Sequence, residues 1–380
     1  MELDDCNVSA VDLFCGVGGL TYGLEQAGID VEAGVDIDPE CEYTFAENNN
    51  AEFIQDDVME LADERPEEVL RLFDKKADAK LLAGCAPCQP FSSLTNDLET
   101  REHDKWGALK GLERLVEYIK PELVVMENVY EIQAYQVYDE FVDTLWELDY
   151  QVNPPNDRKV YCPEYGIPQK RKRTVLLASK SGPIDLKYPT HSADDYPTVK
   201  ERIDNLPNIE AGEVHEEDPL HRSQGMMERN MERIKISEPG GTWEDWKEEG
   251  REDLLADCHT EESGKSYKAP YSRMRPNEPA PTITTQFYNY GSGRFGHYDT
   301  GQNRALSLRE GAMLQTFPRG YSFIEGEEEV SMSKIGRWIG NAVPPKLAEI
   351  VGESVTQHIE WISRQSTMED FLDECHPVSE

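Results

Sequence analysis

The sequence predicts an α/β protein with a doubly wound, mostly parallel sheet and a second, smaller domain. In the first 180 residues, short apolar segments alternate with longer segments that suit helices. A glycine-rich turn follows the first apolar segment, and Asp36 follows the second. After about residue 181 the alternation gives way to long, charged segments. We therefore expect a first domain at 1–180, a second at 181–330, a segment at 331–364 that returns to the first domain, and an acidic tail at 365–380.

The expected strands are short apolar runs, and the expected helices lie between them. Strands are expected at 10–14, 31–35, 53–54, 81–83, 123–126 and 174–178. Helices are expected at 39–48, 66–75, 107–120, 135–148 and 346–357, and the tail after Arg364 is expected to be loose. No apolar run approaches the ~18 residues of a membrane span, and no signal pattern opens the chain. We expect a soluble, cytoplasmic monomer.

The first glycine-rich turn, Cys15 to Leu20, suits the binding of a nucleotide-like cofactor. Its glycines allow a ligand to approach the backbone, and the next helix presents N–H groups at its N-terminus. An ordinary tight turn would also explain these glycines. However, Asp36 ends the next strand about 20 residues later, where an acid can bind a ribose. Asp57, after the third strand, is a candidate for a further polar contact such as the adenine amine.

Two residues at the ends of later strands are candidates for chemistry. Cys88 follows the 81–83 strand in a turn that Gly84, Pro87 and Gln89 keep short. Its thiol can act as a nucleophile if its pKa is lowered, although a buried, inert cysteine is the more common case. Glu127 follows the next strand, where a cap for the following helix, shared with Asn128, is the simpler explanation. Two candidates on successive strand ends favour a site.

The cysteines give little sign of a disulfide framework or a metal site. The eight cysteines are scattered along the chain. Cys85 and Cys88 form one Cys-x-x-Cys motif, which would suit a redox pair or half of a zinc site. Because no second pair completes four ligands, we expect no metal. The polar stretch 92–106 is expected to be either disordered or a lid over the site.

The net charge of −37, from 75 acidic and 38 basic residues, argues at first sight against a nucleic-acid partner. Either the protein has no polyanionic ligand, or it works at very high salt, where the Debye length falls to ~3 Å and repulsion from phosphates is screened. We expect the second case, a halophilic protein. Its acidic residues crowd into segments such as 60–68 and 244–253, as on a solvated surface.

Two segments carry positive charge against this background. In the first, 168–173, strand alternation would place Gln169, Arg171 and Arg173 on one face, so that two guanidinium groups could act on one ligand. A solvated basic edge is the simpler explanation. The second, 273–304, is rich in arginine and tyrosine and is a candidate nucleic-acid face. A core role for its Ile283 and Phe287 is equally plausible.

The ordered set of motifs resembles that of the DNA (cytosine-5) methyltransferases. The resemblance runs from residue 10 to about 355 and omits roughly 180–270, which is the variable target-recognition region in that family. One departure is Cys85, because the family usually has a residue without a thiol there. The motifs are Asp12-Leu13-Phe14-Cys15-Gly16-Val17-Gly18-Gly19, Gly84 to Ser92, Glu127-Asn128-Val129, Gln169-Lys170-Arg171-Lys172-Arg173, Pro281-Thr282-Ile283-Thr284 and Gly340-Asn341-Ala342-Val343.

The resemblance implies a cofactor, a substrate and a set of site residues. S-adenosylmethionine would lie against Phe14, Gly16, Gly18, Asp36, Ile37, Asp57, Val58, Asn341 and Val343. Cys88 would be the nucleophile and Glu127 the group that contacts the cytosine, with Arg171 and Arg173 as supporting guanidiniums and Arg171 on the O2 side of the base. The partner would be double-stranded DNA, with the cytosine flipped into the pocket. A cognate restriction endonuclease and a halophilic prokaryotic source are further expectations.

Alternatives from other classes make distinct predictions. An amino-methylating enzyme would need an aromatic residue after Asn153-Pro154-Pro155, but Asn156 stands there, so we interpret that segment as a turn. An RNA cytosine-5 methyltransferase would share most of the motifs. A non-catalytic DNA-binding protein would have lost Cys88 or Glu127, and both are present. A dinucleotide oxidoreductase would have no use for Cys88.

Overall fold

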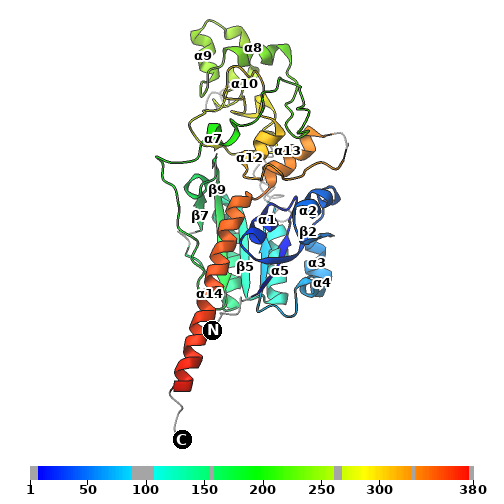
Figure 1. Ribbon diagram of the computed structural model, residues 1–380, viewed down its shortest axis with the longest axis vertical. Helices are drawn as coiled ribbons and strands as arrows, with labels where there is room; N and C mark the ends of the chain where they lie inside the picture. Colours follow the sequence, from blue (N-terminus) through cyan, green and yellow to red (C-terminus); the bar gives the residue numbers. More distant parts are fainter. Residues whose placement is uncertain (1–6, 88–106, 155–157, 261–267, 327–329, 376–380) are drawn as a thin grey trace. The chain divides into compact units, whose positions relative to one another are not determined.

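The computed structural model describes residues 7–87, 107–154, 158–260, 268–326 and 330–375 (Figure 1). The chain divides into two units, which we call unit 1 and unit 2. Unit 1 comprises Met1–Val160, Lys172–Tyr188 and Leu347–Glu380, and unit 2 comprises Tyr161–Arg171 and Pro189–Lys346. This division differs from the expected boundaries at 180 and 330. A short segment before residue 172 already belongs to unit 2, and the return to unit 1 comes only at Leu347.

Unit 1 is built on the predicted doubly wound sheet. The strand order is β3-β2-β1-β4-β5-β9-β6, with β7 also paired to β9. Strands β1 to β5 pair in parallel, and β9 is antiparallel to both β5 and β6. Because β1 pairs with both β2 and β4, the chain reverses its direction of winding there. The strands are β1 (Val8–Leu13), β2 (Asp30–Asp36), β3 (Glu52–Gln55), β4 (Ala79–Gly84), β5 (Leu123–Val129), β6 (Gln151–Val152), β7 (Lys159–Tyr161) and β9 (Lys172–Ser179).

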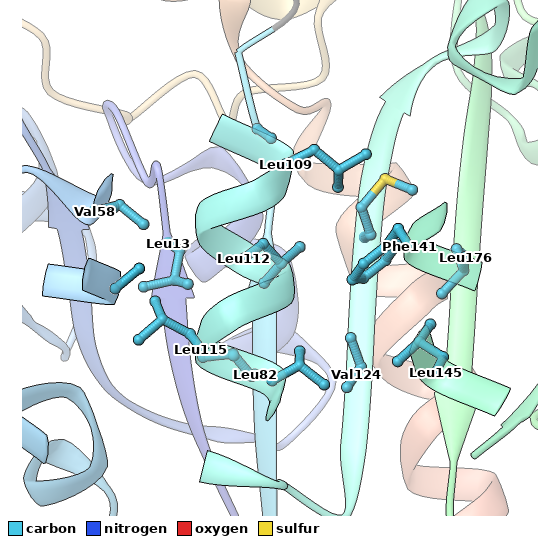
Figure 2. Packing of buried hydrophobic residues seen from close by; sticks show 14 of the residues in the cluster. Leu13, Val58, Leu82, Leu109, Leu112, Leu115, Val124, Phe141, Leu145 and Leu176 are labelled. Carbon is cyan, nitrogen blue, oxygen red and sulfur yellow. The ribbon is translucent and has the colours of Figure 1, made fainter. Parts of the chain in front are cut away.

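One face of the sheet packs against α5 in an apolar core. Leu109, Leu112 and Leu115 fall on one side of α5 because they are three residues apart. They are buried with Leu82 of β4 and Val124 of β5 (Figure 2). The helices of unit 1 are α1 (Gly19–Gln26), α2 (Glu42–Asn48), α3 (Val58–Glu64), α4 (Pro66–Leu72), α5 (Gly107–Ile119), α6 (Gln136–Glu147) and, from Leu347, α14 (Pro345–Cys375), with short 3₁₀ helices η1 (Pro39–Cys41) and η2 (Tyr130–Ala134).

Helix α1 covers the opposite face of the sheet. Leu13 joins the α5 core, so strand alternation directs Asp12 to the other face, where it accepts a hydrogen bond from Thr21 of α1. Helix α14 packs against the C-terminal end of α1. The approach is close: a Cβ atom on Gly352 would lie 2.6 Å from Cβ of Ala27, the residue that follows α1. The sheet is therefore covered by helices on both faces, as parallel sheets require.

Two local features differ from the sequence-based expectations. Glu127 lies within β5, which continues to Val129. Helix α14 continues to Cys375 instead of ending near residue 357, because no Gly or Pro interrupts it between Gly352 and Pro377. The Asn153-Pro154-Pro155 segment, interpreted as a turn, lies partly outside the described residues. The buried Asn153 side chain bonds the backbone of β9 through Val175 O and Leu177 N.

Unit 2 has short elements joined by long loops, in agreement with the loss of apolar alternation. Its paired strands are β8 (Gln169–Lys170) and β10 (Ala280–Pro281), which are parallel. Its helices are α7 (Val199–Ile203), α8 (Glu228–Ile236), α9 (Trp243–Glu248), α10 (Asp257–Thr260), α12 (Leu308–Leu314) and α13 (Met332–Asn341), with 3₁₀ helices η3 (Cys162–Tyr165), η4 (Glu252–Leu254) and η5 (Tyr290–Ser292). Among the described residues, no helix is long and apolar enough to cross a membrane.

Arg273 and Arg304, two arginines of the 273–304 segment, are fully buried and have structural roles. The prediction that this segment's arginines form a nucleic-acid face is therefore wrong for these two. The Arg273 guanidinium donates to five backbone carbonyls and to Asn303. Arg304 forms a double hydrogen bond with Glu310, with both distances at 2.7 Å. Ile283 and Phe287 are also fully buried, so the core interpretation holds for them. A guanidinium with several donors can join loops that have no strand ladder.

Glu310 balances the buried charge of Arg304. Burial alone would raise the pKa of Glu310, but Arg304 and then His297 outweigh burial and hold this pKa well below its usual range. Glu310 also accepts the backbone N–H of Ser307 and so completes the N-terminal cap of α12. One carboxylate therefore satisfies a buried cation and a helix start.

We predict that Glu310→Gln destabilises the protein by about 3–5 kcal/mol, because Arg304 keeps a buried charge without its partner. Urea unfolding measures the free energy of unfolding without changing ionic strength. The matched control is Glu360→Gln, since Glu360 pairs with Arg364 on the surface, with both side chains more than 60% exposed. The control should change stability by at most ~0.5 kcal/mol. Equal effects of the two substitutions would contradict the structural role of the buried pair.

Candidate active site

The glycine turn after β1 has a backbone that few sequences can adopt. Phe14, Gly16 and Gly18 have φ angles of 61°, 51° and 85°. Such values are costly for a residue with a side chain, so Phe14 stores local strain of about 1–2 kcal/mol. The N–H of Gly18 donates to Cys15 O at 2.9 Å, and α1 starts at Gly19 without a side-chain cap. The turn therefore brings backbone groups and a helix N-terminus to the end of β1.

Asp36 closes this turn from the end of β2. Its Oδ2 accepts the N–H of Gly16 at 2.8 Å, and its Oδ1 accepts the N–H of Asp38 at 2.9 Å. Burial raises the pKa of Asp36, and these hydrogen bonds oppose the rise. Each carboxylate oxygen keeps a second lone pair that could accept a ribose hydroxyl. Ile37, the next residue, has 64% of its surface exposed, as expected of a side chain available to a flat ligand.

The two glycines of the turn have different roles. A Cβ on Gly18 would lie 2.3 Å from Nδ2 of Asn49, so Gly18 is required for packing. A Cβ on Gly16 would meet only Asp36, at 4.0 Å, among the described residues. The space over Gly16 is thus open to a ligand. This open backbone beside the Asp36 carboxylate fits S-adenosylmethionine.

The remaining expected cofactor residues lie in less direct positions. Asp57 caps α3 by accepting the N–H of Met59 at 2.8 Å. The Val58 side chain is buried in the α5 core, so its backbone is the part left for a ligand contact. Asn341 and Val343 belong to unit 2, where Asn341 is the exposed last residue of α13 and Val343 is buried.

The candidate nucleophile, Cys88, lies outside the described residues, as does the 92–106 stretch expected to be a lid. The strand that leads to Cys88 is well placed, since β4 ends at Gly84 beside β1 and β5. In the β4–β5 register Gly84 pairs with Met126, so Cys85 comes next to Glu127 and Ala86 next to Asn128. Within the described part of the chain, no group of His, Cys, Asp and Glu could hold a metal ion.

Glu127 is a buried carboxyl that lies between a thiol and a guanidinium. Its surface is only 3% exposed. The Cys85 thiol donates to Oε2, with Sγ at 2.9 Å. Oε1 is also buried and forms an ion pair with Arg173, whose Nε lies 2.8 Å away, but it accepts no hydrogen bond from the described residues. A buried oxygen in this state indicates a donor that is not among the described residues.

Glu127 and Asn128 do not cap a helix, so the simpler explanation for them is wrong. The 3₁₀ helix after β5, η2, has Val129 at its N-cap position and no side-chain cap. Asn128 instead donates from Nδ2 to Ala86 O at 3.1 Å, which ties the end of β5 to the segment that leads to Cys88.

Arg171 and Arg173 do not share a strand face, contrary to the prediction. The N–H of Arg171 bonds Gln169 O in a tight turn, so the strand breaks into β8 and β9. Arg173 then pairs with Val129 of β5, which makes it a diagonal neighbour of Glu127. Arg171 remains in unit 2, where it donates to the carbonyls of Ile283, Gly340 and Ala342 at 3.3–3.4 Å.

Two glutamines complete the network around Arg171 in unit 2. Gln169 accepts the N–H of Ile283 at 2.9 Å and donates to Gln315 Oε1 at 2.6 Å. Gln315 donates to Ala342 O, also at 2.6 Å. Gln169 belongs to the 169–173 motif and was therefore considered in the sequence analysis. Nothing in the sequence around Gln315 indicated that it would contribute to this network. Together with Arg171, these residues hold the segment that contains Asn341 and Val343.

Solved structures of methyltransferases share this fold. A putative DNA modification methyltransferase from an Escherichia coli prophage is 21% identical, with a TM-score of 0.68 over 93% of this chain and 100% of that one. A methyltransferase of Entamoeba histolytica is 13% identical, with a TM-score of 0.61 over 93% and 99%. These likenesses show an α/β fold with a doubly wound sheet, as the sequence predicted.

The chain belongs to the family of C-5 cytosine-specific DNA methylases, whose pattern it matches over residues 8–357. It is 43% identical to the Type II methylase M.HgiDII of Herpetosiphon aurantiacus, over 93% of this chain and 96% of that protein. It is 29% identical to the Type II methyltransferase M1.HphI of Haemophilus parahaemolyticus, over 92% and 87%. The protein is a DNA cytosine-5 methyltransferase that uses S-adenosylmethionine, which confirms the predicted family, activity, cofactor and DNA substrate.

Asp12, beside the cofactor turn, is a buried acid that sequence reasoning did not single out. It is fully buried, and its Oδ2 accepts the Thr21 hydroxyl at 2.7 Å, whereas its Oδ1 accepts no hydrogen bond from the described residues. Burial raises its pKa to about 7, against the effect of the Thr21 bond, and the nearby charge of Asp36 adds to the rise. The fold therefore favours the protonated form of Asp12.

We predict that Asp12→Asn flattens the dependence of stability on pH between about 4 and 8. A raised pKa in the folded state gives stability that is complete below the pKa of the unfolded state, ~4, and is lost as the pH rises through about 7. At ~1.4 kcal/mol per pKa unit, the wild type should lose on the order of 3–4 kcal/mol more than the variant. Urea unfolding at pH 4 and pH 8 measures this difference. The same pH slope in both proteins would contradict the assignment.

Proposed function

We propose that the protein is the methyltransferase of a Type II restriction-modification system and acts through a covalent adduct between Cys88 and carbon 6 of a flipped-out cytosine. The observation that carries this proposal is the buried Glu127 carboxyl, whose Oε1 accepts no hydrogen bond from the described residues, beside the strand that leads to Cys88. The Type II relatives support a cognate endonuclease in the same cell. They also support a cytoplasmic site of action, because such enzymes are bacterial and their DNA lies there. We propose a monomer, as the sequence led us to expect.

The chemistry needs a nucleophile because carbon 5 of cytosine reacts poorly by itself. The Cys88 thiolate adds to carbon 6, and the electron pair of the 5,6 double bond makes carbon 5 enamine-like. S-adenosylmethionine, when bound, supplies the electrophilic methyl group. A base then removes the proton from carbon 5, the double bond re-forms, and the carbon–sulfur bond breaks to release the thiolate.

Glu127 and Arg173 handle the charge that the addition places on the ring. A proton shared between the Glu127 carboxyl and ring N3 neutralises the developing charge. Arg173, 2.8 Å from Glu127 Oε1, holds that carboxyl in place. We give this supporting role to Arg173 instead of dividing it with Arg171, whose guanidinium is already occupied by backbone carbonyls.

The cofactor residues expected from the sequence remain our proposal for the S-adenosylmethionine site. Gly16 supplies the open backbone, Asp36 the ribose contact and Ile37 the exposed apolar surface. Arg171 contributes indirectly, because it holds the segment that carries Asn341 and Val343. The full set is Phe14, Gly16, Gly18, Asp36, Ile37, Asp57, Val58, Asn341 and Val343.

We predict that duplex DNA containing 5-fluorocytosine becomes covalently attached to the protein in the presence of S-adenosylmethionine. Fluorine at carbon 5 cannot leave as a cation, so the adduct cannot resolve, and a species stable in denaturing electrophoresis should accumulate. Bisulfite sequencing of DNA from an expressing host would first identify the recognised sequence. Cys88→Ala should abolish both the adduct and methyl transfer.

RNA of the same sequence, also carrying 5-fluorocytosine, serves as the control and should remain unattached. If Cys88→Ala still transfers methyl groups, the covalent mechanism is wrong. Attachment of the RNA in preference to the DNA would instead favour an RNA substrate.

The acidic surface supports activity at high salt. Arg65, for example, faces three carboxylates, Asp56, Glu60 and Glu68, at 2.9–3.1 Å. With a net charge of −37, the protein repels DNA phosphates unless salt screens the repulsion. Most DNA-binding proteins lose affinity with salt because they release counterions from the phosphates.

We predict the opposite trend for this protein. Methyl transfer should increase at least about tenfold from 0.1 M to 2 M KCl, as the Debye length falls from ~10 Å to a few Å. Thermal unfolding over the same series separates folding from DNA binding. Full activity at 0.1 M KCl, with a decline above it, would show that the enzyme is not halophilic.

A further inference from the structure

We propose that Cys85 is a positioning residue, whose thiol fixes the Glu127 carboxyl in the orientation that methyl transfer requires. This inference rests on the proposed role of Glu127. It concerns the position at which the chain departs from the usual pattern of its family, three residues before the proposed nucleophile.

The sheet itself sets the Cys85–Glu127 contact. Gly84 pairs with Met126 in the parallel β4–β5 register, so the next residues, Cys85 and Glu127, come side by side. The N–H of Cys85 donates to Leu13 O at 3.3 Å, which anchors its backbone to the end of β1. Its Sγ is 2.9 Å from Glu127 Oε2. The position of the thiol is thus set by a backbone that is hydrogen-bonded to the sheet.

The same register gives a second bond between these two strand ends. Asn128 Nδ2 donates to Ala86 O at 3.1 Å. Two successive residue pairs, Cys85 with Glu127 and Ala86 with Asn128, are therefore joined by hydrogen bonds. This limits relative movement of the two segments at the position where one of them continues to Cys88.

The consequence for Glu127 is a carboxyl held at both oxygens. Cys85 holds Oε2, and the Arg173 guanidinium lies beside Oε1. A glutamate side chain has three rotatable bonds, and restricting them beforehand removes an entropic cost from the reaction. Oε1 accepts no hydrogen bond from the described residues, so a lone pair on it remains to share a proton with the base. A thiol suits this role because it donates weakly and does not add a competing charge.

Substitutions at Cys85 can separate the hydrogen bond from the packing. Cys85→Ser keeps a donor, Cys85→Val fills the volume without a donor, and Cys85→Ala removes both. We expect kcat to fall roughly 10- to 100-fold in the Ala and Val variants, the range of a lost hydrogen bond to a charged group, and to stay within about threefold in the Ser variant. The KM values for DNA and S-adenosylmethionine should change less than about twofold in all three.

The double variant with Glu127→Gln identifies the partner of the thiol. If Cys85 acts through Glu127, Cys85→Ala should have almost no further effect on kcat in the Glu127→Gln background. Additive losses would overturn the proposal, as would a Val variant as active as the Ser variant. Thermal unfolding shows whether a variant is folded. If Glu127→Gln alone keeps full activity, the proposed role of Glu127 fails, and that outcome is distinct from a failure confined to Cys85.

Discussion

The pairing of β1 with both β2 and β4 is the constraint on which the site depends. It brings the glycine turn after β1, the Asp36 carboxylate after β2 and the segment after β4 to one edge of the sheet. The β4–β5 register adds Glu127, and the antiparallel β5–β9 register adds Arg173. Residues as far apart in the chain as Leu13 and Gly84 thus become neighbours through strand pairing, and the chemistry then needs only a few side chains of the right type.

The protein manages charge differently at its surface and in its interior. Outside, carboxylates outnumber cations and face solvent, as around Arg65. Inside, the buried carboxyls have specific arrangements: Glu310 neutralises Arg304, Glu127 lies beside Arg173, and Asp12 is held by Thr21 and favours its proton. The fourth, Glu113, pairs with Lys110. The charge of −37 therefore belongs to the surface. In the described interior, the buried cations discussed above have carboxylate or backbone-carbonyl partners.

Much of the fold could be predicted because apolar strands and glycine turns are local signals. The parallel strands, the turn at Gly16 and Gly18, and the position of Glu127 at the edge of the sheet followed from short segments. The break at Arg171 could not be predicted, because a tight turn inside a basic run has no apolar pattern. The roles of Arg273 and Arg304 could not be predicted either, since the sequence does not distinguish an arginine with buried partners from one exposed to DNA.

The short segment Tyr161–Arg171 makes unit 2 discontinuous along the chain. The chain passes between the units after Val160, Arg171, Tyr188 and Lys346. Strand β8 pairs with β10, and Gln169 and Arg171 bond residues more than a hundred positions later in the same unit. A chimera that took only 189–346 from a relative would therefore pack that foreign segment against the eleven original residues of Tyr161–Arg171. An exchange of unit 2 therefore requires both pieces to move together.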